Sequence, residues 1–444
     1  MIVLKFGGTS VGGADPIRKV GEIVKKVTDR QPVLVVSAVG GITDRLFSLG
    51  QSALLGGAWR DALGEICDRH RSILGELGLP ETLVDPLLEE LRGLVGGISL
   101  IRELTPRTRD YLVSFGERLS ARLVASHLES VGVPAVALDA FDAGLLTDSR
   151  FGSARPLADS EARIRQSLQS LRDGEEIPVI TGYIGKDEEG AITTLGRGGS
   201  DFSAAVFGAA LGAEEIQIWT DVDGVMSADP RIVGSATHLP KLNFAEASEL
   251  AFYGAKVIHP AAMVPAVRRD IPIRVLNTYR PELDGTTIVS RLAPSERGVK
   301  SITSKSRVSM INVVAPPMAL QFGFVERIAD AFKRREIVID MISTSEVSVT
   351  LTTDRGPDLE PLVDELSRFS EVTVEHEMAQ ISVVGEEIRE RVGFAAEVFD
   401  VLRRLEINVE MISFGATRIN LSFVVSSDRV RDAVQGLHDH LFGR

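Results

Sequence analysis

The chain has 444 residues, enough for about three domains, and its 44% apolar and 25% charged residues are typical of a folded globular protein rather than a disordered one. With 49 Lys and Arg against 62 Asp and Glu, the formal net charge is −13, which argues against nucleic acid or an anionic membrane as a partner but not against an anionic small molecule. The single cysteine, Cys67, excludes an intrachain disulfide and a cysteine-based zinc cluster.

The first residues lack the basic region and the long apolar core of a signal peptide, and no apolar run approaches the ~20 residues that cross a bilayer. We therefore expect a cytoplasmic protein with no membrane partner. The seven histidines show no shared metal-ligand spacing, so no metal site made of side chains is predicted.

Four short aliphatic runs predict strands of a buried, mostly parallel sheet. They are apolar on both faces and alternate with longer helical stretches, as strands covered by helices on both sides do. The runs are residues 2–6, 32–37, 177–180 and 215–219. Residues 56–130 contain no convincing strand and predict helices with breaks at 78–80 and 96–97. The sequence up to about residue 292 therefore predicts one layered α/β domain.

A polar stretch at 293–298 interrupts this pattern and predicts a linker, which we place at 293–306. Beyond it the chain repeats itself at an offset of 70 residues, with nine of 21 positions identical between 323–343 and 393–413. Each copy runs from a glycine turn through an amphipathic helix into a strand, which is typical of a βαββαβ unit. We therefore expect a domain at 1–292 and two such units, at 307–378 and 379–444.

The first candidate site follows the first predicted strand, where the sequence reads KFGGTS at 5–10. The glycines allow backbone N–H groups to approach an anion, although the spacing is not that of a Walker A loop. Taken alone, such a glycine pair after a strand is more often a plain tight turn. Lys5 favours the functional interpretation, because an ammonium inside an aliphatic strand is costly unless it meets an anion.

The second candidate site is TLGRGGSD at 194–201, with three glycines in four positions before a predicted helix. Arg197 offers a planar fork that suits a carboxylate. The alternative is a strand-to-helix turn in which Ser200 and Asp201 cap the helix. A charged pair within a glycine-rich loop favours a binding role over this alternative.

Other charged residues are ambiguous by themselves. Residues 114–118 predict the start of a helix, and Glu117 in its first turn is explained by the helix dipole alone. Asp221 and Asp223 follow the fourth strand, at the edge where open α/β sheets bind ligands; a metal role is one interpretation of them, and a turn is the commoner use of such residues. Lys256 is placed near a helix end, and His259 before a proline is interpreted as structural.

Together these motifs resemble those of aspartate kinases of the monofunctional type with two ACT units, over essentially the whole chain. In order they are KFGGTSV at 5–11, SFGER at 114–118, TLGRGGSD at 194–201, WTDVDG at 219–224, DPR at 229–231 and GAKVIHP at 254–260. The resemblance implies an amino-acid-kinase fold, a sandwich of helices around a mostly parallel sheet, followed by two ferredoxin-like ACT units. It also implies the reaction: MgATP phosphorylates the side-chain carboxylate of L-aspartate to 4-phospho-L-aspartate, the first step of lysine, threonine and methionine biosynthesis.

The resemblance assigns roles to individual residues. Lys5 is expected to contact the transferring phosphate and Asp201 to organise the reacting groups. Aspartate is expected to be held by Thr43, Glu117, Arg197 and Ser200, with Glu117 on its α-ammonium and Arg197 on its α-carboxylate. ATP is expected at Lys5, Gly7, Gly8, Ser10, Thr220, Asp221, Met226, Arg231 and Lys256, with Mg²⁺ held mainly through the phosphates.

The residue types fit this chemistry. An aspartate side chain has a pKa near 3.9, so the nucleophile is ionised at pH 7 and needs no general base. The enzyme must instead bring two anions together and neutralise charge on the phosphoryl oxygens, which lysine, backbone N–H groups and Mg²⁺ can do. Met226 departs from the pattern, since related enzymes often place an aromatic residue there, but its flexible side chain can still pack against adenine.

The segment ISTSEVSV at 342–349 resembles the ACT signature of lysine-regulated aspartate kinases. The implied effector site comprises Met318, Gln321, Gly323, Phe324, Val325, Asp340, Thr344, Ser345 and Glu346. Asp340 and Glu346 would face the side-chain ammonium of L-lysine. The second copy keeps an acid at Glu410 but has Ala416 in place of the second one, so it is expected to pair rather than bind, within a homo-oligomer formed through the ACT units.

Two other functions compete with this one. Another kinase of the same fold would act on glutamate, N-acetylglutamate, carbamate or UMP, but the opposite charges of Glu117 and Arg197 favour a free α-amino acid. A catalytically inactive sensor that binds amino acids through its ACT units is the second alternative. Intact Lys5, Arg197 and Asp201 argue against it.

Overall fold

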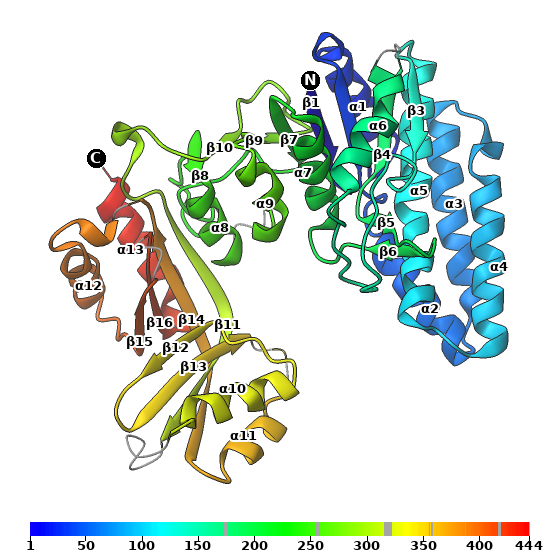
Figure 1. Cartoon of the computed structure of the whole chain (residues 1–444). Coiled ribbons are helices and arrows are strands. Elements are labelled where there is room, and N and C mark those ends of the chain that lie inside the picture. Colours follow the sequence, from blue (N-terminus) through cyan, green and yellow to red (C-terminus); the bar gives the residue numbers. More distant parts are fainter. Residues whose placement is uncertain are drawn as a thin grey trace. The chain divides into compact units, whose positions relative to one another are not determined.

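The computed structural model describes residues 1–172, 176–253, 258–314, 322–354, 356, 358–386, 388–415 and 419–443 (Figure 1). They form two compact units. The first contains Met1–Val225, Pro240–Phe244 and Val257–Arg291, and the second contains Met226–Leu239, Ala245–Lys256 and Leu292–Arg444. No helix in the described part of the chain is both long and apolar enough to cross a bilayer.

The first unit is built on an eight-stranded sheet in the order β3-β4-β2-β1-β7-β9-β10-β8. Its pairs are parallel except for β9 with β10, which confirms the predicted mostly parallel sheet, and the four predicted runs are β1, β2, β4 and β7. The strands are β1 (Ile2–Phe6), β2 (Pro32–Val36), β3 (Ala135–Leu138), β4 (Ile177–Thr181), β7 (Glu215–Thr220), β8 (Lys241–Asn243), β9 (Ile273–Asn277) and β10 (Thr286–Val289).

Helices cover both faces of this sheet. The helices are α1 (Ala14–Lys25), α2 (Ile42–Leu55), α3 (Trp59–Leu77), α4 (Asp85–Ile101), α5 (Pro106–Ser130), α6 (Ser160–Arg172), α7 (Gly199–Leu211) and α9 (Pro260–Arg268). The strands β5 (Ile184–Lys186) and β6 (Ile192–Thr194) form a separate two-stranded hairpin. Ile2, Leu4 and Phe6 of β1 pack into a core with α1 and α5, whereas Val3 lies against Gly208 of α7. Because side chains alternate along a strand, Lys5 shares the face of Val3.

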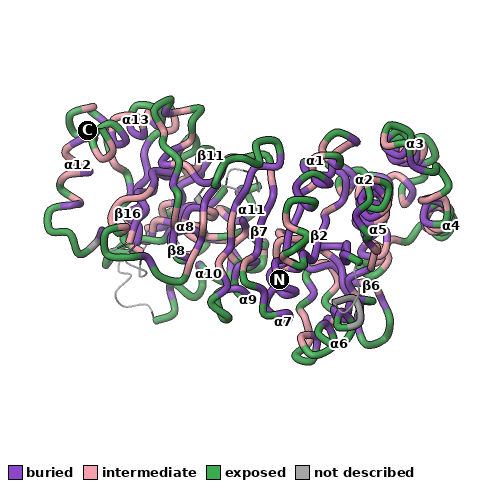
Figure 2. Tube along the Cα trace, turned by 90° about the horizontal axis from the view of Figure 1, so that it is seen from above, coloured by how far each residue is buried: buried purple, intermediate pink, exposed green. Residues whose placement is uncertain are grey.

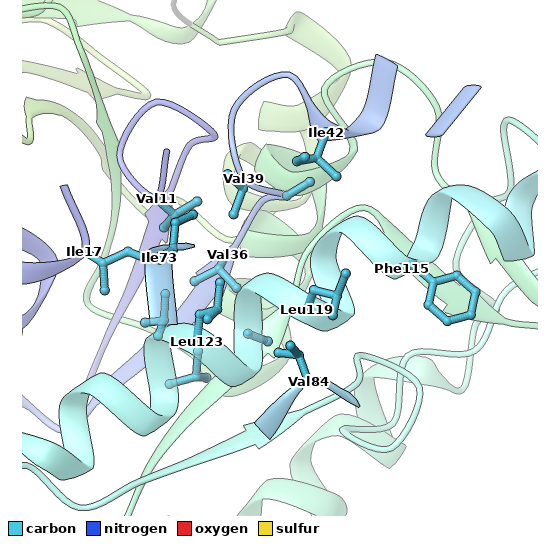
Figure 3. Packing of buried hydrophobic residues seen from close by; sticks show 14 of the residues in the cluster. Val11, Ile17, Val36, Val39, Ile42, Ile73, Val84, Phe115, Leu119 and Leu123 are labelled. Atoms are coloured by element: carbon cyan, nitrogen blue, oxygen red, sulfur yellow. The ribbon is translucent and has the colours of Figure 1, made fainter. Parts of the chain in front are cut away.

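The main core of the first unit joins β1 and β2 to the helices α1 to α5 (Figure 3). Strands β1 and β2 are buried along their whole length (Figure 2). The predicted helices at 56–130 are present, and the break at 78–80 separates α3 from the next helix. The break at 96–97 is wrong, because α4 runs through both glycines while Leu91, Val95 and Ile98 keep its apolar face buried.

The second unit contains the repeat. Its strands β11 (Ser301–Val314), β12 (Met341–Thr344), β13 (Ser348–Asp354), β14 (Glu371–Val384), β15 (Met411–Phe414) and β16 (Asn420–Ser426) form one antiparallel sheet in the order β12-β13-β11-β14-β16-β15. Its helices are α8 (Phe244–Tyr253, which enters the unit at Ala245), α10 (Phe324–Arg334), α11 (Glu360–Leu366), α12 (Phe394–Arg404) and α13 (Val430–Phe442). The two ACT units thus share a continuous sheet. Strand β11 begins inside the predicted linker, and the predicted domain boundaries stay a prediction.

Residues 226–239 are built into this second unit, although they lie between strands of the first sheet in sequence. The N–H of Ile302 in β11 donates to the Ser227 carbonyl at 2.8 Å, and Ser227 Oγ lies 2.9 Å from His438 Nε2 of α13. Ala228 and Val233 pack in the same core as α12 and α13. This segment therefore packs as part of the second unit, against β11, α12 and α13.

Candidate active site

A cleft of about 530 Å³ opens at the carboxyl ends of β1, β2 and β4 in the first unit. This edge of a parallel sheet is where open α/β folds bind ligands. The cleft is lined by Lys5, Gly8, Ser37, Ala38, Val39, Gly40, Gly41, Thr43, Asp44, Glu117, Gly152, Tyr183, Gly196, Arg197, Gly198, Gly199, Ser200 and Asp201. The structure thus brings together seven of the predicted residues: Lys5, Gly8, Thr43, Glu117, Arg197, Ser200 and Asp201.

Lys5 and Asp201 form an ion pair inside the cleft. Lys5 Nζ lies 2.6 Å from Asp201 Oδ1, and the two side chains are only 10% and 14% exposed. Apart from this ion-pair contact, Asp201 Oδ1 has no hydrogen-bond partner among the described residues. Strand alternation turns Lys5 towards α7, whose first turn carries Asp201. The sequence predicts that Lys5 meets an anion, and Asp201 of the same chain is such an anion.

Glu117 contributes a buried carboxylate from the middle of α5. It is 3% exposed, its Oε1 accepts the N–H of Ala38 at 3.2 Å, and its Oε2 has no hydrogen-bond partner in the described part of the chain. Burial raises the pKa of Glu117 from 4.5 to about 8, although the hydrogen bond from Ala38 opposes this shift. A cation in the cleft would favour the ionised form of the Glu117 carboxylate.

The position of Glu117 in its helix differs from the prediction. Helix α5 begins at Pro106 behind the N-cap Thr105, so Glu117 lies about three turns inside it rather than in the first turn. The helix dipole therefore does not explain the residue. A carboxylate buried in mid-helix beside a cleft points instead to a ligand.

The glycine-rich segment 196–199 also lines the cleft. Gly198 has a φ of +71°, and a Cβ there would lie 2.6 Å from the Cβ of His259, so both backbone conformation and space require glycine. The turn leads into α7, and its exposed Arg197 makes no ion pair with another described residue. The first turns of α2 and α7, with Thr43 and Ser200, also line the cleft, and helix N-termini favour anions.

Other residues that were predicted to bind the nucleotide do not line the cleft and instead form hydrogen bonds around the ends of β1 and β7. The N–H of Gly7 donates to the Trp219 carbonyl at 3.1 Å. Ser10 is fully buried, and its hydroxyl donates to the same carbonyl at 3.1 Å and lies 2.7 Å from Thr278 Oγ1. Thr220 ends β7 and donates to the exposed Asp221 at 3.2 Å.

Three residues that were predicted to bind the nucleotide are absent from the described lining of this cleft. Met226 and Arg231 belong to the second unit, where Arg231 is exposed and forms a forked contact with Asp229 at 2.7 Å. Lys256 lies outside the described residues. Their nucleotide roles stay predictions.

The predicted effector residues lie around β12 and the start of α10. Asp340 is not free: Lys305 Nζ lies 2.6 Å from its Oδ2 and 2.9 Å from Asp354 Oδ1, and burial raises the pKa of Asp340 against the effect of Lys305. Glu346 is exposed. Ser345 accepts the N–H of Ser348 at 3.1 Å and closes the turn after β12.

The remaining effector predictions vary in exposure. Phe324 is buried in the core of the first ACT unit, behind the N-cap Gly323, whereas Val325 and Thr344 are exposed. Met318 and Gln321 lie outside the described residues.

Sequence reasoning missed Tyr183 and Gly152 in the lining. Tyr183 has a φ of +67°, lies two residues after the end of β4, and its N–H donates to Ser203 Oγ at 3.0 Å. Its place after a buried strand was a usable signal, because that edge carries the ligand. Gly152 comes from an irregular loop and had no such signal. In the described part of the chain, no group of three or more His, Cys, Asp or Glu could hold a metal ion.

Comparison with known proteins agrees with this geometry. The Amino acid kinase family matches residues 1–277, and an ACT domain family matches residues 381–441. Aspartokinase 2 of Arabidopsis thaliana is 39% identical over 99% of this chain and 84% of its own length. Lysine-sensitive aspartokinase 3 of Escherichia coli is 35% identical over 100% of this chain and 99% of its own.

Two solved structures of E. coli aspartokinase III cover the whole chain at 34% identity. The complex with aspartate and ADP superposes with a TM-score of 0.83 over all of both chains. The complex with lysine and aspartate gives a TM-score of 0.86 and is covered to 99%. By fold, by cleft and by full-length similarity, the chain belongs to the amino acid kinase family and, within it, to the aspartokinases.

Proposed function

We propose that the chain phosphorylates the side-chain carboxylate of L-aspartate with MgATP. The observation that carries this proposal is Glu117, a carboxylate buried beside the cleft, one oxygen of which has no hydrogen-bond partner among the described residues. A substrate with an α-ammonium supplies the missing cation, and Arg197 in the glycine-rich loop that lines the same cleft supplies the fork for its α-carboxylate. Substrates without both charges leave one of these residues unmatched.

In the reaction, a carboxylate oxygen of aspartate attacks the γ-phosphorus of ATP. The bond between that phosphorus and the β,γ-bridging oxygen breaks, and ADP leaves with the electron pair. Lys5 is placed to neutralise charge on the transferring phosphoryl group, while Asp201 holds the ammonium at 2.6 Å and fixes its position. Because the acceptor is already ionised, no residue has to remove a proton.

Nucleotide binding is supported by the E. coli aspartokinase III complex with ADP. In this chain Gly8, at the loop after β1, and the first turn of α7 are the cleft groups suited to phosphates. Asp201, which forms the ion pair with Lys5, is the carboxylate suited to approach Mg²⁺ together with the phosphates. When bound, the ion would shield the phosphate charges from the incoming carboxylate.

We also propose feedback inhibition by L-lysine through the first ACT unit. A lysine-sensitive E. coli relative, and an E. coli structure with lysine, support this effector. Asp340 is already paired with Lys305, so the exposed Glu346 is the acid better placed to meet a ligand ammonium. The exposed Ile342 and Ile412 on the two edge strands support a homo-oligomer formed through the ACT units.

The test is ADP release by the purified chain with ATP and Mg²⁺, with L-aspartate, L-glutamate, N-acetylglutamate, carbamate or UMP as acceptor. Hydroxylamine in a parallel reaction captures an acyl phosphate as a hydroxamate. The proposal predicts release and hydroxamate with L-aspartate. Release with another acceptor instead would favour a different kinase of this fold, and no release with any of them would favour an inactive sensor.

A further inference from the structure

Asp110 is a second buried carboxylate on the helix that carries Glu117. The two residues are seven positions apart in α5, two turns, so they lie on the same side of the helix. Asp110 is 1% exposed and forms no ion pair with another described residue. Removing a carboxylate from water costs considerable desolvation free energy. The hydrogen bonds that Asp110 accepts therefore indicate its role.

Those hydrogen bonds join two loops that are distant in sequence. Oδ2 of Asp110 accepts the N–H of Gly152 and the N–H of Thr194, both at 2.8 Å. Gly152 lines the cleft, and Thr194 is the last residue of β6, directly before the segment with Arg197. One carboxylate oxygen therefore ties both segments to α5.

Further contacts carry this restraint into the cleft. The N–H of Ala154 donates to the Thr194 carbonyl at 2.8 Å, so both backbone groups of Thr194 are held. At Gly196 a Cβ would lie 3.1 Å from the Gly152 carbonyl oxygen, which shows that the two segments touch. Loss of the Asp110 acceptor would leave two N–H groups without their partner at the base of the Arg197 loop.

We infer that Asp110 is a positioning residue that holds residues 195–198, the turn that carries Arg197, in the conformation that binds aspartate. The inference rests on the proposed function, because it names a determinant of that same site. Asp110 touches neither the cleft nor the reacting atoms, and it acts through the backbone of Thr194 and Gly152. Its effect should fall on aspartate, whose α-carboxylate Arg197 is proposed to hold, more than on ATP.

The chain offers a matched control in the same hairpin. Asp187 is also buried, at 4% exposure; its Oδ1 accepts the N–H of Ala191 at 2.7 Å, and its Oδ2 accepts the hydroxyl of Ser149 at 3.0 Å. It closes the turn at the end of β5 and β6 that is remote from Thr194, and through Ser149 it also contacts the segment that carries Gly152. Asp187→Ala therefore removes a comparable buried carboxylate but leaves in place both N–H groups that Asp110 accepts, and with them the tie to the Arg197 loop.

The experiment measures KM for aspartate and for ATP, and thermal unfolding with and without aspartate, in the full-length wild type and its variants. In Asp110→Ala we expect KM for aspartate to rise about tenfold or more, with KM for ATP within about twofold. Asp110→Asn keeps an oxygen that can accept both N–H groups and should stay within about threefold. Asp187→Ala should lower the unfolding temperature and leave KM for aspartate unchanged.

Three results would overturn the inference: an unchanged KM for aspartate in Asp110→Ala, an equal rise in Asp187→Ala, or an equal rise in Asp110→Asn. If Asp110→Ala does not fold, Asp110→Ser, whose hydroxyl is too short to reach both donors, replaces it with the same expectations. A wild type without aspartate-dependent activity would instead refute the proposed function, and aspartate-dependent thermal stabilisation reports binding independently of turnover.

Discussion

Glu117 Oε1 accepts the N–H of Ala38 at 3.2 Å, while its Oε2 is buried without a partner among the described residues. One oxygen of this mid-helix carboxylate is thus bound to the loop after β2, and the other is left for a ligand in the cleft. A buried carboxylate with an unpaired oxygen lowers the folding stability of the empty protein. This loss of stability indicates a site that binds a cation.

Glu117→Gln should make the empty protein more stable and less active. With a native pKa of about 8 and an ordinary value of 4.5, folding at pH 7 takes up a proton at Glu117, which costs about 3 kcal/mol. The cost grows as pH rises from 4.5 to 8 and disappears as pH falls towards 4.5. Denaturant unfolding at pH 7 and at pH 5 should show a gain that is larger at pH 7.

The same variant should use aspartate poorly. Removing one charged partner of a desolvated ligand group typically costs ~2–5 kcal/mol, so KM for aspartate should rise at least about tenfold while ATP binding is nearly unchanged. Normal saturation by aspartate in Glu117→Gln or Glu117→Ala would show that another residue binds the ammonium.

Lys5→Ala should lower kcat by orders of magnitude with a smaller effect on aspartate binding, because charge shifts on the phosphoryl group during transfer. Its removal also leaves the Asp201 carboxylate without its cation, which typically costs ~3–5 kcal/mol in a buried pair. Lys5→Ala combined with Asp201→Asn separates the two effects: the double variant should recover stability but not kcat. Retention of most of the activity in folded Lys5→Ala would assign the role to another cation.

Lysine inhibition should depend on Glu346. Activity is titrated with L-lysine and, separately, with L-threonine, in the wild type, in Glu346→Ala and in Glu360→Ala, an exposed acid in the first turn of α11 that serves as control. We expect lysine to inhibit the wild type and the control but to act weakly on Glu346→Ala, since inhibition requires different affinity for two states. Inhibition by threonine alone, or equal lysine sensitivity in all three proteins, contradicts this site.

The second unit should lose stability in acid through His438. It is 3% exposed, its Nε2 lies 2.9 Å from Ser227 Oγ, and burial lowers its pKa below 6.5, partly offset by Asp439. The unfolded chain therefore binds the proton more readily, so stability present above pH 6.5 is lost as pH falls below it. Unfolding temperatures between pH 7.5 and pH 5.5 should fall less steeply in His438→Gln. An identical slope would show that other groups control the acid response.

Much of the architecture could be predicted from local patterns. Runs that are apolar on both faces identified β1, β2, β4 and β7, and the offset of 70 residues identified the paired ACT units. The helix through Gly96 could not be predicted, because burial of one apolar face outweighs the low helix propensity of two glycines.

The site was less accessible to sequence reasoning where it depends on distant contacts. Lys5 and Arg197 stand out because charge and glycine are unusual in their local patterns. The ion pair of Asp340 depends on Lys305, which lies in a segment predicted to be a linker and is in fact part of β11. Asp110 acts through two backbone groups far along the chain, and no spacing in the sequence reveals that.

The most direct test of the central claim, that this cleft binds L-aspartate through Glu117, is a calorimetric titration with L-aspartate at pH 7 in buffers of different ionisation enthalpy. Because Glu117 has a pKa of about 8 in the empty cleft and should ionise against the α-ammonium, binding should release about one proton. Glu117→Gln should release none. Binding to the wild type without proton release, or with the same release in Glu117→Gln, would contradict the account.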